Sequence, residues 1–196
     1  MNIRIENLDI QNHPEQLEEV SALRVEIFRA YPYLYEGDVQ KESEYLATYL
    51  KPRARIFLAY DDQKLIGATT CVPMADEEDS FKAPIIHAGF EPEKILYFGE
   101  SVLKSEYRGR GIGVKFFDYR EQYARSLPGI SQTMFCAIVR AMDHPKRPVD
   151  FRSLESFWAN RGYARLPGLT LNYDWREVGE LAESPHLLEY WLKDLG

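Results

Sequence analysis

The sequence is poor in residues that bind metals or form disulfides. Its 196 residues include two cysteines and four histidines, and the histidines stand far apart at positions 13, 87, 144 and 186. No Cys/His spacing resembles a zinc site, so no metal is expected. Cys71 and Cys136 lie in apolar, strand-like runs. This favours buried free thiols and a reducing cytoplasm, although spacing alone leaves a disulfide open.

Long hydrophobic runs and excess positive charge are also missing. No apolar run approaches the ~20 residues of a membrane span, and the opening MNIRIE has no hydrophobic signal-peptide core. The net charge of −7 argues against nonspecific nucleic-acid binding and is compatible with a cationic small substrate. Hydrophobic residues make up 45 % of the chain, enough for a core. We therefore expect one domain over residues 1–196, with neither a membrane nor a nucleic-acid partner.

The hydrophobic pattern predicts a mixed sheet covered by helices. Strands are expected at residues 3–8, 55–60, 65–72, 95–103, 131–139 and 169–175. Helices are expected at residues 15–30, 42–50, 111–127, 152–161 and 185–195, with a polar segment of short helix plus loop at 76–94. This order indicates the α/β (α+β) class.

A glycine-rich loop between a strand and a helix is the most informative segment. It consists of Arg108, Gly109, Arg110, Gly111, Ile112 and Gly113. Alternate glycines leave successive backbone N–H groups without side-chain cover, and such a loop at a helix N-terminus binds anions. A pyrophosphate is the expected ligand, with the two arginines adding positive charge. Val114 follows Gly113 where a P-loop would have Lys, and it stands where a Rossmann fingerprint would have its third Gly, so both motifs are excluded. An ordinary helix start with small residues is the alternative.

Two segments resemble the GNAT superfamily of acyl-CoA-dependent N-acetyltransferases. Residues 100–113 (ESVLKSEYRGRGIG) are similar to that family's pyrophosphate loop, and residues 157–163 (FWANRGY) to its later helix-Gly-aromatic motif. The order of elements agrees with the family fold. The resemblance covers residues 50–175 well and the ends loosely. It implies a single-domain GNAT-like fold, in which a mixed, mostly antiparallel twisted sheet is flanked by helices and opens in a V between the fourth and fifth strands.

The resemblance also implies a reaction. Acetyl-CoA would act as the acyl-donor cosubstrate, and a primary amine of a small molecule or peptide would attack the thioester directly, with no acyl-enzyme and no metal. Backbone groups of Val102 and Leu103 are expected to pair with the pantetheine arm, and the amides of the loop from Arg108 to Gly113 to hold the pyrophosphate. A non-catalytic acyl-CoA-binding regulatory protein of the same fold is the alternative. A non-enzymatic interaction domain is a further alternative. Because dimers are frequent in the family, the resemblance also implies a homodimer.

Glu100 is the first candidate for the base that takes the proton of the amine. It lies in an otherwise apolar strand, where burial would raise its pKa toward a useful range. A structural carboxylate paired with an arginine is an equally weighted alternative. Trp158 stands where the family often has a Tyr that protonates the departing thiolate, and an indole cannot do so. The general acid is therefore unassigned.

The connection between the first two expected helices is the candidate acceptor wall. It carries Tyr31, Tyr33, Tyr35 and Glu36. In GNAT proteins this connection commonly lines the acceptor pocket, and aromatic faces with a carboxylate suit an ammonium group. Packing of the tyrosines onto the core is the alternative. The loop at residues 142–150 is expected to border the same site.

Overall fold

The structure is a computed structural model that describes residues 2–8 and 16–196. The strands are β1 (Ile3–Leu8), β2 (Arg55–Asp61), β3 (Lys64–Pro73), β4 (Ile95–Tyr97), β5 (Ser101–Leu103), β6 (Gln132–Ile138), β7 (Ala164–Trp175) and β8 (Ser184–Asp194). The helices are α1 (Leu17–Phe28), α2 (Val39–Leu46), α3 (Asp79–His87), α4 (Ile112–Ser126) and α5 (Glu155–Asn160). Short 3-10 turns are η2 (Ala47–Leu50), η3 (Met74–Asp76), η4 (Pro92–Lys94) and η5 (Ser105–Tyr107).

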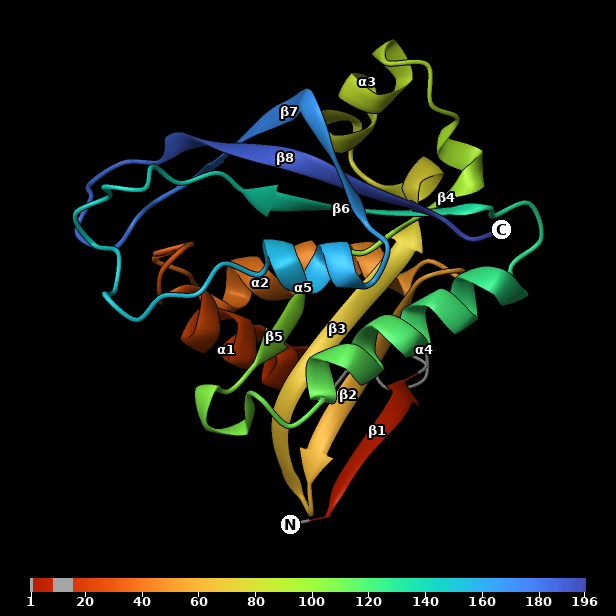
Figure 1. Ribbon diagram of the computed structural model, residues 1–196. Helices are drawn as coiled ribbons and strands as arrows, with labels where there is room; N and C mark the ends of the chain where they lie inside the picture. Colours follow the sequence, from red (N-terminus) through yellow and green to blue (C-terminus); the bar gives the residue numbers. More distant parts are fainter. Residues whose placement is uncertain (1, 9–15) are drawn as a thin grey trace.

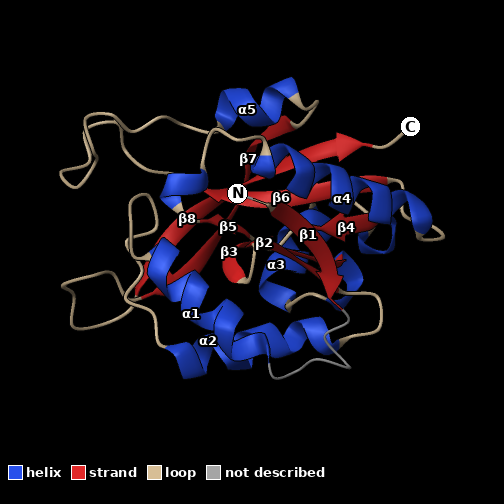
Figure 2. Cartoon of the chain, turned by 90° about the horizontal axis from the view of Figure 1, so that it is seen from below, coloured by secondary structure: helices blue, strands red, loops and turns tan. Residues whose placement is uncertain are grey.

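The strands form one twisted sheet with helices on both faces. The strand order is β1-β2-β3-β4-β6-β8-β7, with β5 paired to β3. The pairing of β4 with β6 is parallel and the other pairings are antiparallel. Helices α1, α2 and α3 lie on one face, whereas α4 and α5 lie on the other (Figure 2). The mixed, mostly antiparallel sheet predicted from the sequence is confirmed.

The expected fourth strand is split in the middle, and the split opens the sheet. Phe98 still donates its N–H to Met134 of β6 at 2.8 Å, whereas Gly99 turns back and donates to Thr70 of β3. A Cβ at Gly99 would collide with the Tyr49 hydroxyl and lie 2.6 Å from Thr70 Oγ1, so only glycine fits there. Beyond the split, β5 pairs with β3 while β6 runs away from it (Figure 1). This divergence is the V-shaped opening expected between the fourth and fifth strands.

The expected helix at residues 185–195 is wrong, because this segment is strand β8. It lies inside the sheet between β6 and β7. Leu188 and Tyr190 pack into the core on the α1–α3 face, and Trp191 packs into the core on the other face. A strand buried on both faces has a nearly continuous apolar run, which cannot be told from a buried helix by periodicity.

Several other boundaries differ from expectation. The second helix begins earlier, since the Asp38 side chain accepts hydrogen bonds from the N–H groups of Gln40 and Lys41 and caps α2. The polar segment at 76–94 contains α3, and β7 starts five residues before the expected 169. The predicted start of the first helix, residue 15, lies outside the described residues.

Candidate functional site

The glycine loop runs onto the first turn of α4. Gly109 has a φ of 75° and Gly111, the N-cap, a φ of 79°, both in the left-handed region that favours glycine. Among the described residues, no side chain caps α4 and its first turn has no acidic residue. The first N–H groups of a helix have no intrahelical partner, and the helix dipole favours an anion there. This end of α4 is therefore built to receive a negatively charged group.

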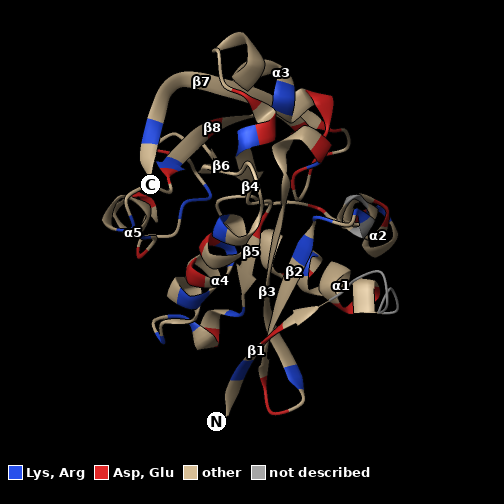
Figure 3. Ribbon diagram, turned by 90° about the vertical axis from the view of Figure 1, so that its right-hand side faces the viewer, with Lys and Arg blue, Asp and Glu red and all other residues tan. Residues whose placement is uncertain are grey.

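Positive charge surrounds the same loop. Arg108 is exposed, and the Arg110 guanidinium donates to the carbonyl of Glu106 at 3.1 Å and lies over the ring of Tyr107. Lys and Arg positions appear in blue near the lower end of α4 in Figure 3. A pyrophosphate would meet both backbone donors and guanidinium groups here.

The backbone of β5 presents one edge to the opening. Thr70 donates to the carbonyl of Glu100, and Lys104 donates to the carbonyl of Ile66. Because hydrogen-bonded positions alternate along an antiparallel pair, Val102 also turns its N–H and C=O toward β3. Ser101 and Leu103 then turn theirs toward the opening. The edge that an extended ligand arm could meet is therefore formed by the residues on either side of Val102.

Glu100 lies at the split, beneath α1. Its carboxylate is buried, with Oε2 at 2.5 Å from Nη1 of Arg24, whereas Oε1 has no hydrogen-bond partner among the described residues. Its carbonyl oxygen accepts from Thr69 Oγ1 at 2.7 Å and from Arg120 Nη1 at 3.4 Å. Burial raises the pKa of Glu100, and the Arg24 charge opposes that rise. The ion pair is what a structural carboxylate would make, while the unpartnered oxygen could accept a proton.

A chain of polar contacts connects Glu100 to the candidate acceptor wall. Arg24 also forms an ion pair with Glu42 of α2. Tyr35 donates its hydroxyl to the other oxygen of Glu42 at 2.6 Å. The guanidinium of Arg24 stacks 4.6 Å from the ring centroid of Tyr45. Arg24 therefore joins α1, α2 and the split strand in one buried network.

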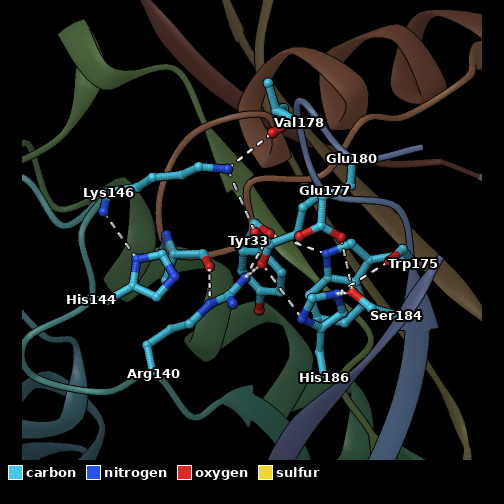
Figure 4. Close-up of polar contacts among 11 residues, drawn as sticks. Tyr33, Arg140, His144, Lys146, Trp175, Glu177, Val178, Glu180, Ser184 and His186 are labelled. Atoms are coloured by element: carbon cyan, nitrogen blue, oxygen red, sulfur yellow. Dashed lines mark hydrogen bonds and ion pairs between the residues drawn. The ribbon is translucent and has the colours of Figure 1, made fainter. Parts of the chain in front are cut away.

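The connection between α1 and α2 is clamped from outside by the segments that follow β6 and β7 (Figure 4). Arg140 donates to the carbonyls of Pro32 at 2.7 Å and Tyr33 at 3.0 Å, and its Nη2 lies 2.5 Å from Glu177 Oε1. Trp175 Nε1 donates to the same carbonyl of Tyr33 at 3.1 Å. These contacts fix the backbone of the connection against β7.

The structure separates the four predicted acceptor residues into two groups. Tyr33 and Tyr35 face the buried network, and burial raises the pKa of Tyr33 to about 12, with the Glu100 charge adding to the rise. Tyr31 packs instead against Phe151, with ring centroids 4.7 Å apart. Glu36 forms an ion pair with Arg29 at the surface. Only the first two are thus brought together with Glu100.

Trp158 is partly buried and packs against the core on the α4–α5 face. Its ring centroid lies 5.1 Å from that of Phe135 and 5.1 Å from that of Trp191. Tyr163 is fully within this core, with its hydroxyl 2.9 Å from Thr133 Oγ1. Both side chains act as packing groups in this arrangement.

Sequence reasoning missed the charged residues of the buried network. Arg24 and Glu42 lie on the buried faces of α1 and α2, and Glu77 follows η3 at the end of β3. Helical spacing places Arg24 on the stripe of Val20 and Leu23, which is a signal that the sequence contained. Glu77 had no comparable signal, because it stands in a polar stretch.

Across the described part of the chain, no group of three or more His, Cys, Asp or Glu residues could hold a metal ion. Both cysteines are free thiols. None of the described helices has the length and apolar character needed to cross a membrane.

Comparisons with known proteins agree with this geometry. The family model described as Acetyltransferase (GNAT) family matches residues 18–148. The chain therefore belongs to the GNAT acetyltransferase family, a family of acyltransferases, and the resemblance seen in the glycine loop is confirmed. A search of curated proteins found no match.

Solved structures with the same fold have low sequence identity to this chain. Arabidopsis thaliana NAA60 in complex with a bisubstrate analogue is 15 % identical with a TM-score of 0.64, and all of both chains are covered. An N-acetyltransferase from Staphylococcus aureus is 12 % identical with a TM-score of 0.64, again with both chains fully covered. A chimera of spermidine N-acetyltransferase SpeG from Vibrio cholerae and hSSAT is 11 % identical with a TM-score of 0.58, covering 100 % of this chain and 96 % of that one.

Proposed function

We propose that this protein transfers an acetyl group from acetyl-CoA to a primary amine of a small molecule or peptide. The observation that carries the proposal is the continuity between the open edge of β5 and the uncapped, acid-free start of α4. The first can pair with an extended amide-bearing arm and the second can hold a diphosphate. When bound, acetyl-CoA supplies the acetyl group as a thioester.

In this proposal the backbone of β5 and the loop hold the cosubstrate. Leu103 and Ser101 pair with the pantetheine arm, while Val102 keeps β5 attached to β3. The N–H groups from Arg108 to Gly113 bind the pyrophosphate, and the guanidinium of Arg108 adds a charge-assisted contact. Because the direction of the backbone N–H and C=O groups alternates along β5, we assign to Ser101 the pairing with the pantetheine arm that was expected at Val102.

The acceptor amine approaches from the α1–α2 face in this proposal, since Glu100 extends its carboxylate toward that face. Glu100 accepts the ammonium proton on Oε1, which leaves the nitrogen lone pair able to attack. Arg24 keeps the carboxylate in place through Oε2. The names of the related structures, a bisubstrate complex and a spermidine N-acetyltransferase, support an amine as the acceptor class.

Release of free thiol from acetyl-CoA tests the proposal. The protein should release thiol with primary amines and not with tertiary amines of similar size, and the acetylated amine should appear in equal amount. Acetyl-CoA binding without thiol release for any amine would favour the acyl-CoA-binding alternative. Absence of both binding and release would overturn the proposal.

We extend the proposal to a cytoplasmic protein of one domain, with residues 1–196 acting as a unit. The two free thiols support a reducing compartment. A homodimer stays a prediction, which sedimentation of the purified protein would test.

A further inference from the structure

The face of the sheet beneath α1, α2 and α3 buries more negative than positive charge. Glu42, Glu77 and Glu100 are at most 7 % exposed; Arg24 is the buried cation on this face, while the buried Arg120 of α4 reaches the carbonyl of Glu100 from the other face. Arg24 pairs with Glu42 and Glu100. Burying a charge without a counter-charge is costly, so a carboxylate in this position needs a proton or a cation.

Glu77 is the carboxylate left over by these pairs. Neither of its oxygens has a hydrogen-bond partner among the described residues, although the side chain is only 3 % exposed. Lys51 and Lys82 act on Glu77 through their charge alone, since their bonded partners are other groups: Lys51 donates to the carbonyl of Asp76, and Lys82 forms an ion pair with Asp79 at 3.0 Å. Burial raises the pKa of Glu77 to about 7; the charges of Glu78 and then Glu100 add to the rise, and those of Lys51 and Lys82 oppose it.

Other buried oxygen atoms without hydrogen-bond partners lie at the split strand. The hydroxyl of Tyr49, 0 % exposed, lies against Gly99 and has no hydrogen-bond partner in the described part of the chain. Glu100 Oε1 is likewise unpartnered. Carboxylate oxygens accept and cannot donate, so a ligand that fits them must bring N–H or O–H donors.

Tyrosine side chains lie within electrostatic range of Glu77. The charge of Glu77 contributes to the raised pKa of Tyr45, Tyr49, Tyr97 and Tyr173, so all four hydroxyls lie within its electrostatic reach. Phe81 of α3 packs between two of these rings, with its ring centroid 5.5 Å from that of Tyr97 and 5.3 Å from that of Tyr173. Ring faces beside a carboxylate are the surroundings that stabilise an ammonium ion.

We propose that Glu77 and the tyrosines around it bind a second ammonium group of the acceptor, so that the substrate is a diamine or a longer polyamine. This inference rests on the proposed function, because it places the reacting amine at Glu100 and the second cation at Glu77. An ammonium group brings three N–H donors and one positive charge. It would satisfy the unpartnered oxygens of Glu77 and balance the charge that Arg24 leaves uncompensated.

A matched series of amines tests the inference. Aliphatic α,ω-diamines of increasing length are compared with mono-amines of the same length, using the wild-type protein and the variants Glu77→Gln and Glu78→Gln. We expect one diamine to exceed its mono-amine in kcat/KM by roughly 10- to 100-fold, the size of one charged hydrogen-bonding contact. That ratio should collapse toward one in Glu77→Gln and persist in Glu78→Gln, which changes an exposed neighbour. Glu77→Met provides a second variant if the amide does not fold.

Calorimetry of diamine binding separates this inference from the proposed function. Binding heat that Glu77→Gln abolishes would support the second-cation site even if no acetyl group were transferred. Transfer to mono-amines and diamines with equal kcat/KM would overturn the inference and leave the proposed function standing. Equal diamine binding by wild type and Glu77→Gln would also overturn it.

Discussion

Glu100 combines two properties that usually exclude each other. One carboxylate oxygen is held by Arg24, as in a structural ion pair, while the other has no partner among the described residues. The burial of Glu100 could be predicted from its apolar strand. Its partner Arg24 could not be predicted, because Arg24 lies on helix α1, 76 positions earlier in the sequence.

Replacing Glu100 with Gln should lower kcat by roughly 10²- to 10⁴-fold, the range for loss of a general base. The affinity for acetyl-CoA should stay the same, as measured by calorimetry. Glu42→Gln is the matched control, because it weakens the same Arg24 network without removing the proposed base. Equal kcat losses in the two variants would show that Glu100 has only a structural role.

Glu77 should make the protein less stable as the pH rises. Its pKa is about 7 in the folded protein and lies near 4.5 in the unfolded chain. The folded state therefore holds the proton more tightly, so the stabilising contribution is complete below pH 4.5 and is lost as the pH passes 7. The loss amounts to about 3 kcal/mol. Urea unfolding across this range should show that slope in wild type and a weaker one in Glu77→Gln; parallel curves would contradict the assignment.

At the scale of elements, the start of α4 depends on backbone conformation. Gly111 at φ 79° and Gly129 at φ 83° would each meet nothing within 4 Å if given a Cβ. Alanine at either position should cost about 1 kcal/mol of unfolding free energy because of its left-handed backbone. Only Gly111→Ala should also weaken acetyl-CoA binding, since Gly129 follows the other end of α4. Equal affinities in the two variants would remove the loop from the cosubstrate site.

The contacts of Arg140 with the α1–α2 connection hold the candidate acceptor wall in place. Arg140→Met removes the donors to Pro32 and Tyr33, so Tyr33 and Tyr35 should lose their fixed positions. We expect kcat/KM for the amine to fall roughly 10- to 100-fold, with little change in acetyl-CoA affinity. Arg165→Met, which breaks a half-exposed pair with Glu189 in the same sheet, is the control. Equal effects of both variants on amine kinetics would argue against positioning.

The elements around the glycine loop and the central strands β3 and β6 were predictable, whereas strand β8 and the split of the fourth strand were not. Local signals mark α4, whose start needs glycine at positive φ and whose body repeats apolar residues every three or four positions. Strand β8 lacks such a signal, since Leu188 and Trp191 are buried on opposite faces only when β6 and β7 flank them. Tertiary pairing decides its conformation. The split at Gly99 depends likewise on the distant hydroxyl of Tyr49.

At the scale of the whole molecule, the two faces of the sheet carry different groups. The face under α4 and α5 carries the proposed anion-binding loop, and the face under α1, α2 and α3 carries the buried carboxylates (Figure 2). The opening between β5 and β6 connects the two faces. A donor held on one face and an amine on the other would meet at Glu100.

Thermal unfolding with and without acetyl-CoA tests this central claim most directly. Acetyl-CoA at 100 times its Kd should add about 2.7 kcal/mol of stability, which raises Tm by roughly 5–10 °C for a chain of this length. Arg108→Glu should lose most of the rise, whereas Arg53→Glu, beyond the other end of α4, should keep it. No rise in the folded wild-type protein, or an equal rise in all three, would contradict the account.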